Sequence, residues 1–162
     1  MAISITLRNY LDSFGIQYQL ISHPRSLSSS MTAEAAKIPG GKLAKAVVVQ
    51  SDETHPYVVV IPATHRVDLS ELRHQLGRNF HLADEESLCR SFRDCDRGAV
   101  PAAAQAFGLP VLVEECLLDC DEVFFEAGDH TELVRVSGPD FEYLMAQAGQ
   151  GHFSRPAQGP RH

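Results

Sequence analysis

The sequence predicts an α+β fold: a mixed, largely antiparallel and barrel-like sheet with helices packed on its outside. Two observations carry this prediction. Short β-branched or apolar segments outnumber the amphipathic helical segments, and most neighbouring strand segments are joined by short polar stretches, as in hairpins. The 162 residues, 44% hydrophobic and 22% charged, fit one soluble domain that buries its own core.

The N-terminal part predicts a helix, a strand and a second helix. Apolar side chains recur at helical spacing on one face of residues 3–14, and Gly15 can end that helix. A short strand is expected at 18–21. Thr32 can cap a short helix that runs through Ile38.

The middle of the chain predicts a hairpin and a capped helix. Residues 45–50 and 57–62 are β-branched and apolar, and the polar stretch between them favours a hairpin. Asp68 is placed to cap a helix over 69–76, which Gly77 ends.

The rest of the chain is richer in strands than in helices. The expected elements are, in order, a strand at 80–82, a helix from Asp84, strands at 111–113, 122–126 and 133–136, and a helix from Pro139. The stretch 127–131 contains Gly and Asp, which predicts a second hairpin there.

We expect one domain over residues 1–153 and an unstructured tail at 154–162, where apolar side chains are almost absent. No apolar run is long enough to span a bilayer and no signal peptide is visible, so the expected location is the cytoplasm, without membrane contact. The net charge of −7 argues against DNA binding or a broad basic face for nucleic acid, but it permits contact with one nucleic-acid end.

Standard catalytic signatures are missing from the sequence. It contains no P-loop, no dinucleotide fingerprint and no Gly-x-Ser-x-Gly motif. The cysteines stand at positions 89, 95, 116 and 120, without the two-residue gap of zinc ribbons or thioredoxin-like sites. We expect them to be small buried hydrophobic residues, and we expect neither a metal nor a cofactor.

Lys45 and a short loop are the first candidates for chemistry. Lys45 follows a glycine turn at the mouth of an apolar strand, where its ammonium group could meet a phosphate or a developing oxyanion. A lysine that reaches solvent at a strand end is the simpler interpretation. Gly98, Ala99, Val100 and Pro101 form a tight loop whose amides could hold a carbonyl or a water, unless it is an ordinary surface turn.

The second hairpin loop and one histidine complete the candidates. Gly128, Asp129, His130 and Thr131 would place an imidazole and a hydroxyl at the end of the sheet. His23, after the first predicted strand, is a weaker candidate because lone histidines are more often structural.

Taken in order along the chain, these stretches resemble one family, the YbaK/prolyl-tRNA-synthetase-associated domain, whose members edit mischarged tRNA in trans. The resemblance extends to about Phe153. It rests on residues 23–24, 32–36, 44–48, 62–65, 94–101 and 125–132. It implies that Lys45 takes the place of the family's essential lysine. Gly98 to Ala102 takes the place of its Gly-x-x-x-Pro loop, with Ala102 where a second proline is usual.

The resemblance also implies a function. Such an enzyme binds the CCA acceptor end of a mischarged tRNA and hydrolyses the ester to a small amino acid such as Ala, Ser or Thr. A synthetase pocket separates such amino acids by only about 10–200-fold, so a second sieve is needed. An ester is already activated, so a water positioned by the 98–101 loop and a charge from Lys45 suffice. His23, Thr32 and the 128–131 loop become candidate substrate contacts, and a synthetase becomes a candidate partner.

Two other functions stay open at this point. Ala102 departs from the family pattern. The chain could therefore be a non-catalytic module that binds a tRNA end or a synthetase and regulates it. A small-molecule hydrolase or redox protein that uses a cysteine is the third possibility. It predicts loss of activity when the thiols are alkylated.

Overall fold

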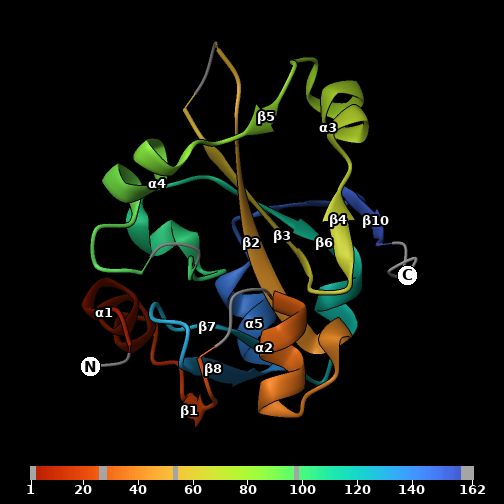
Figure 1. The fold of residues 1–162 in the computed structure, drawn as a ribbon. Coiled ribbons are helices and arrows are strands. Elements are labelled where there is room, and N and C mark those ends of the chain that lie inside the picture. Colours follow the sequence, from red (N-terminus) through yellow and green to blue (C-terminus); the bar gives the residue numbers. More distant parts are fainter. Residues whose placement is uncertain (1–2, 26–28, 53–54, 97–98, 158–162) are drawn as a thin grey trace.

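The computed structural model describes residues 3–25, 29–52, 55–96 and 99–157. Its main sheet has the strand order β1-β8-β7-β2-β3-β6-β9, and β5 pairs with β2 beside this path (Figure 1). The strands are β1 (Gln19–Ser22), β2 (Leu43–Gln50), β3 (Tyr57–Pro62), β5 (His81–Leu82), β6 (Val111–Glu114), β7 (Glu122–Glu126), β8 (Glu132–Ser137) and β9 (Gly149–Gly151). A second, two-stranded sheet joins β4 (His65–Val67) to β10 (Ser154–Pro156).

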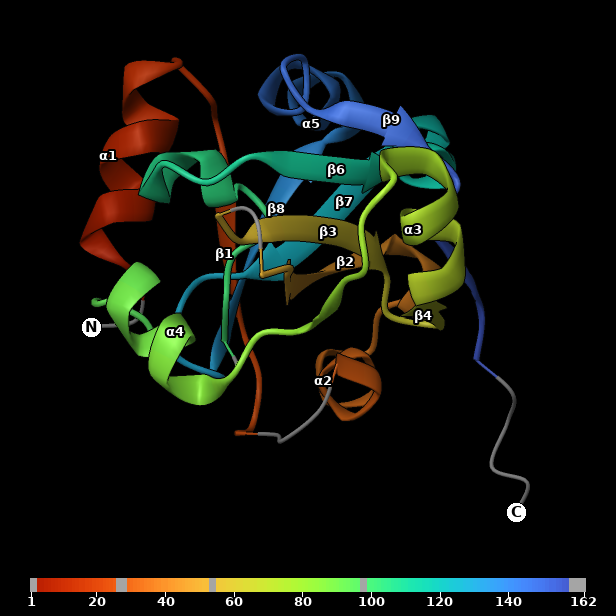
Figure 2. The same ribbon diagram turned by 90° about the horizontal axis from the view of Figure 1, so that it is seen from above.

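Helices cover both faces of the main sheet. They are α1 (Ile5–Ser13), α2 (Ser29–Ala36), α3 (Leu69–Leu76), α4 (Glu85–Ser91) and α5 (Gly138–Leu144), with short 3₁₀ turns η1 (Gly40–Lys42), η2 (Ala104–Phe107) and η3 (Glu115–Asp119). Seen from above, α5 and α2 lie on opposite sides of the sheet (Figure 2). Within the described part of the chain, no helix has both the length and the apolar character needed to cross a membrane.

The α+β class with outer helices is confirmed, and the sheet is open. Both predicted hairpins, β2–β3 and β7–β8, are antiparallel. Three pairings are parallel, namely β2 with β7, β3 with β6, and β6 with β9. Among the described strands none pairs β1 with β9, so the sheet does not close into a barrel.

Helix α3 begins and ends where the sequence predicts. The Glu71 amide donates to the Asp68 carboxylate at 3.1 Å, which satisfies one of the free amides of the first turn. Gly77 follows the helix with a φ of 74°, a left-handed conformation that costs glycine little.

Helix α2 differs from the prediction. It begins at Ser29, so Thr32 lies inside the helix and is fully buried instead of capping it. The earlier start lets the helix turn the neighbouring Ala33 onto the sheet, where it packs with Leu43 and Phe124. Burial against the sheet therefore outweighs the capping preference of threonine.

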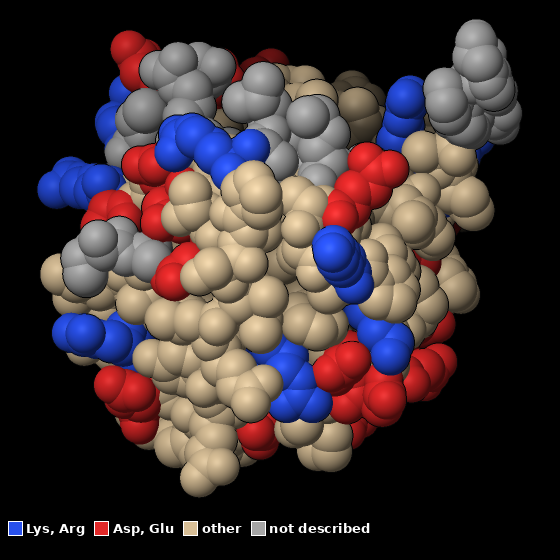
Figure 3. Space-filling view, turned by 60° about the horizontal axis from the view of Figure 1, so that its bottom comes forward, with Lys and Arg blue, Asp and Glu red and all other residues tan. Residues whose placement is uncertain are grey.

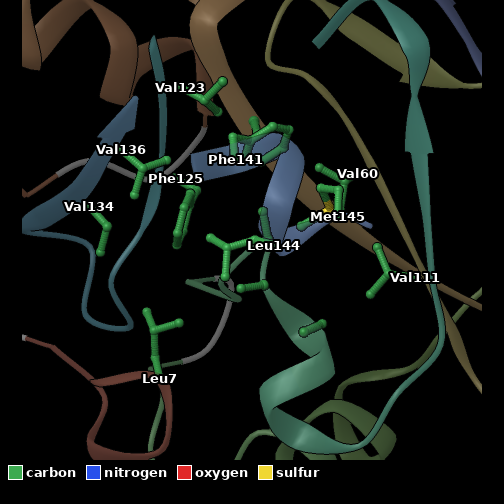
Figure 4. Packing of buried hydrophobic residues seen from close by; sticks show 14 of the residues in the cluster. Leu7, Val60, Val111, Val123, Phe125, Val134, Val136, Phe141, Leu144 and Met145 are labelled. Atoms are coloured by element: carbon green, nitrogen blue, oxygen red, sulfur yellow. The ribbon is translucent and has the colours of Figure 1, made fainter. Parts of the chain in front are cut away.

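The two faces of the main sheet are packed differently. On one, here called the continuous face, a single apolar cluster joins strands β2, β3, β6, β7 and β8 to α1 and α5 (Figure 4). Figure 4 labels Leu7, Val60, Val111, Val123, Phe125, Val134, Val136, Phe141, Leu144 and Met145 of this cluster. The other, here called the interrupted face, carries two separate clusters, one under α3 around Leu72 and one under α2 around Ala33.

The chain beyond Phe153 is structured, contrary to the predicted tail at 154–162. Strand β10 pairs with β4, and the Ala157 amide donates to the Thr64 carbonyl at 2.9 Å. The buried Glu114 carboxylate accepts the Phe153 amide at 2.8 Å and the Ser154 hydroxyl at 2.9 Å. These polar bonds order a segment that has little apolar surface, so the domain extends through residue 157. Residues 158–162 lie outside the described part of the chain.

Candidate active site

Lys45 interrupts an apolar face of the sheet. Side chains of β2 alternate between the two faces, so Lys45 shares the interrupted face with Leu43 and Val47. Leu43 belongs to the cluster under α2, whereas Val47 packs with the cluster under α3. Across the hairpin, Lys45 lies directly opposite Ile61. The lysine therefore stands at the boundary between the two clusters, on the face where an apolar residue would join them.

Among the described residues, the ammonium group of Lys45 has no counter-charge. Lys45 is half-buried, and burial, followed by the positive charge of Arg66, lowers its pKa. Within the described residues, no hydrogen bond or ion pair holds its ammonium group. A partly desolvated cation without a partner is poised to bind an anion from outside the chain.

Lys42 provides the opposite case in the same stretch of sequence. Its ammonium group lies 2.9 Å from the Asp121 carboxylate and 3.7 Å from that of Glu122. The hydrogen bond to Asp121 raises the pKa of Lys42, and the ammonium is satisfied at the surface. Only one of these two lysines is therefore available for a ligand.

The described residues of the predicted 98–101 loop are buried. Gly98 lies outside the described residues. Ala99 and Val100 are 0% and 8% exposed, and Pro101 is buried as well. Val100 packs into the core of the continuous face. The Ala99 amide already donates to the Asp96 carbonyl at 3.0 Å.

The 128–131 loop is held by its own aspartate. The Asp129 carboxylate accepts the Thr131 amide at 3.0 Å, the Thr131 hydroxyl at 2.8 Å and the Glu132 amide at 3.2 Å. Gly128 has a φ of 127°, and a Cβ there would come within 3.2 Å of Ser4, so the position requires glycine. His130 is 9% exposed and adopts a left-handed φ of 67°, which is unusual for a non-glycine residue.

Hydrogen bonds bring three of the predicted segments together. The Asp96 amide donates to the Gly128 carbonyl at 2.6 Å, and the His23 amide donates to the Thr131 carbonyl at 2.9 Å. Arg25 bridges the same segments, with its guanidinium 3.6 Å from the Asp96 carboxylate and 3.5 Å from the Asp129 carbonyl. His23, the 128–131 loop and the approach to the 98–101 loop therefore form one cluster.

Lys45 is connected to this cluster through the sheet. Strand β2 pairs in parallel with β7 at Ala44, which lies opposite Phe125, and β7 leads into the 128–131 loop. Thr32 is buried in α2, which covers the interrupted face. His23 adds a buried polar atom, since its Nε2 has no hydrogen-bond partner while its Nδ1 lies 2.7 Å from the Pro24 carbonyl oxygen.

Glu126 is a buried acid that sequence reasoning missed. It ends β7 on the same face as Phe124, and it is 8% exposed with an Oε1 atom that has no partner. Burial, with a smaller contribution from the Asp129 charge, raises its pKa to about 7. Strand alternation would have found it, because an acid in step with Phe124 points toward the interior.

The described cysteines have little thiolate character. Burial and the Asp94 charge raise the pKa of Cys95 to about 12, and burial also raises the pKa of Cys116 and Cys120. Cys116 is exposed, so the prediction of buried cysteines is wrong there, and the side chain of Cys89 lies outside the described ones. Within the described residues, no three His, Cys, Asp or Glu side chains are grouped to hold a metal ion.

Solved structures share the fold of this chain. The crystal structure of hypothetical protein APE2540 superposes with a TM-score of 0.80 at 17% identity, covering 93% of this chain and 99% of that one. The crystal structure of a proposed trans-editing enzyme for prolyl tRNA synthetase gives 0.79 at 20% identity, covering 94% and 96%. Identities of this size establish the shared fold alone.

The family is established by the sequence match. No curated protein matches the chain at a significant level. The aminoacyl-tRNA editing domain family, in contrast, matches residues 23–144, a span that includes Lys45 and both candidate loops. This span is well over half of the chain and confirms the resemblance noted from the motifs. The chain therefore belongs to the aminoacyl-tRNA editing domain family.

Proposed function

We propose that the protein hydrolyses the ester between a wrongly attached small amino acid, such as Ala, Ser or Thr, and the terminal ribose of a tRNA. The observation that carries this proposal is Lys45: a half-buried, unpartnered ammonium in an otherwise apolar face, inside the editing-domain match. A structural lysine would be paired, as Lys42 is, or would extend into solvent.

The reaction needs one water and one stabilised negative charge. Water attacks the carbonyl carbon, the bond from that carbon to the ribose oxygen breaks, and the proton from the water passes to the departing ribose hydroxyl. The products are the free amino acid and the uncharged tRNA. Lys45 stabilises the developing oxyanion or holds the terminal phosphate, which a charge in a partly dry site does far better than one in water.

The two loops position the reacting groups. Since the Ala99 amide is committed to the Asp96 carbonyl, the Val100 amide is the donor we assign to the water or the aminoacyl carbonyl. His130 and the segment Gly128 to Thr131 form the wall that limits the size of the amino acid. Their shape is set by the Asp129 bonds rather than by the substrate, which is the preorganisation that such a wall needs.

The test is single-turnover deacylation of tRNAs mischarged with Ala, Ser or Thr. Removing one preorganised donor of this kind commonly costs about 10²–10³-fold in rate, so Lys45→Ala should lose at least that much while keeping its fold. Lys45→Arg should rescue poorly, because a planar guanidinium does not replace a compact ammonium.

Lys42→Ala is the matched control. Its deacylation rate should stay within a few-fold of wild type, because the Lys42 ammonium is paired with Asp121 and Glu122. Circular dichroism establishes that each variant is folded. Near-normal turnover by Lys45→Ala, on a mischarged tRNA that the wild type hydrolyses, would contradict this mechanism. Binding without release of any amino acid would instead favour a non-catalytic module.

A further inference from the structure

Two arginines face each other in the small sheet. In the antiparallel pair of β4 and β10, Arg66 lies directly opposite Arg155, and both are exposed. Like charges directly opposite each other destabilise a strand pair. The pairing therefore carries a local electrostatic cost that needs a source of negative charge.

The chain supplies only part of that negative charge. The Arg155 guanidinium donates to the Asp68 carboxylate at 2.6 and 3.2 Å. Arg66 has no such acceptor among the described residues, and its positive charge acts on Lys45, whose pKa it helps to lower. Of Lys45, Arg66 and Arg155, only Arg155 has a carboxylate partner among the described residues.

This concentration of positive charge is local. The protein as a whole has a net charge of −7, and on the face drawn in Figure 3 basic and acidic side chains are interspersed. Several other basic side chains are neutralised by neighbouring acids, as in the pairs Lys42–Asp121 and Arg135–Glu122. Two neighbouring cations, Lys45 and Arg66, that have no carboxylate partner among the described residues of an acidic protein indicate a ligand that brings negative charge.

The surface between the two arginines is concave. A hollow of about 390 Å³ is lined by Arg66, Asp68, Leu69, Ser70, Arg155 and Pro156. It opens at the start of α3, where the Asp68 carboxylate caps the helix and binds Arg155, so that, among the described residues, Arg66 is the unpaired charge of the hollow. Its walls include the apolar Leu69 and Pro156, which suit the face of a base better than a free ion.

We propose that this Arg66–Arg155 hollow binds the acceptor strand of the tRNA just upstream of its terminal nucleotide, with Arg66 as the contact to a phosphodiester. The inference rests on the proposed function, because it takes Lys45 as the place where the terminal ester lies. It gives the bound strand a direction, from Lys45 along β4 toward β10. A basic contact of this kind acts on binding and positioning and does not touch the reacting atoms.

The test uses binding alone. A fluorescent, non-acylated RNA that ends in CCA is titrated with wild type, Arg66→Gln and Arg66→Lys. Loss of one charged hydrogen bond should weaken binding about tenfold for Arg66→Gln, whereas Arg66→Lys should keep most of the affinity. If Lys45, Arg66 and Arg155 each contact one phosphate, the slope of log K against log salt should be about −2.1, falling to about −1.4 in Arg66→Gln.

Arg8→Gln makes the same change in charge on α1, on the other side of the sheet, and should leave binding unchanged. A second RNA, with the phosphate upstream of the terminal nucleotide made neutral, should bind wild type as weakly as Arg66→Gln binds the natural RNA. The two changes together should weaken binding no further, because they remove the same contact. Binding of this second RNA distinguishes a contact between Arg66 and one particular phosphate of the strand from a general attraction of the protein for phosphates.

Three results would overturn the inference: no binding of the RNA by wild type, equal loss in Arg8→Gln and Arg66→Gln, or independent losses from the protein and RNA changes. The proposed function fails separately. If wild type binds the RNA through Arg66 but releases no amino acid from mischarged tRNA, the hollow stands and the deacylase does not. If wild type deacylates mischarged tRNA but Arg66→Gln binds the RNA as tightly as wild type does, the proposed function stands and the proposal for the hollow fails.

Discussion

The two faces of the sheet are built from the same strands but have different roles. On the continuous face one apolar cluster runs from α1 to α5 without a break. On the interrupted face Lys45 separates the clusters under α2 and α3, and Glu126 brings a buried carboxyl to the end of β7. The Lys45 ammonium and the Glu126 carboxyl both occupy positions where apolar side chains would improve packing.

This difference separates stability from chemistry. Apolar packing stabilises a fold in proportion to the area it removes from water, so an unbroken cluster is the more stable arrangement. A face that keeps an unpartnered cation gives up some of that stability. The interrupted face is therefore where we expect variants that alter activity, and the continuous face is where we expect variants that alter only the free energy of unfolding.

The largest effect is expected from Phe125→Ala on the continuous face. Phe125 is fully buried, and truncating such a side chain typically costs about 3–5 kcal/mol of unfolding free energy. Its neighbour Phe124 points to the interrupted face and is 6% exposed, so Phe124→Ala should cost less. Urea unfolding measures both. Equal losses would show that the two faces contribute alike to stability.

Glu126→Gln should change how stability depends on pH. The folded protein keeps this proton up to about pH 7, whereas the unfolded chain releases it near the ordinary pKa of 4.5. Between these values the folded state holds more protons, so its free energy of unfolding falls as pH rises, by about 3 kcal/mol at most.

The Gln variant should lose that decline and be more stable than wild type above pH 7. Urea unfolding from pH 4.5 to 8 tests this, with the exposed Glu142→Gln in α5 as the control. If the free energy of unfolding of Glu126→Gln falls with rising pH as it does in wild type, a group other than Glu126 holds the proton.

Lys45→Met should raise stability while abolishing activity. The substitution joins the two apolar clusters and removes a partly desolvated charge, which commonly gains about 1 kcal/mol. The thermal midpoint should therefore rise in the variant that no longer deacylates. If Lys45→Met were instead destabilised, the lysine would have a structural role and the contrast between the faces would weaken.

The smallest effect is expected from Cys116→Ser. Cys116 is exposed in η3, outside both faces, and surface substitutions of this kind usually stay within about 0.5 kcal/mol. Deacylation should be unchanged, and alkylation of the native protein should leave its rate intact. A loss of turnover in the folded variant would instead favour a protein that uses a cysteine in its reaction.

Local signals in the sequence predicted most of the elements. The hairpins, the Asp68 cap and the end of α3 depend on neighbouring residues, and all of them are confirmed. The parallel pairings and the open sheet were not predictable, because they join segments far apart in the chain. Thr32 was misplaced because tertiary burial decided where α2 begins.

The candidate site was predictable in its parts but not in its electrostatics. Lys45 was identified from a strand preceded by glycines, yet its neighbour Arg66 belongs to another strand and no sequence pattern links them. The order in β10 comes from Glu114, about forty residues away, so a composition argument could not detect it. Strand alternation, had it been applied to β7, would have found Glu126.

The pairing of β2 with β7 determines when the site can form during synthesis. Leu43 and Ala44 pair with Phe124 and Phe125, which leave the ribosome only after most of the chain has been made. The hairpin of β2 and β3 is local and can form early, and β5 pairs with the far end of β2, but the Leu43–Ala44 part of that edge stays open until β7 arrives. Such long-range pairings slow folding, and open apolar edges attract other chains. The nascent protein therefore carries Lys45 on a strand whose pairing at Leu43 and Ala44 is completed only after β7 has been made.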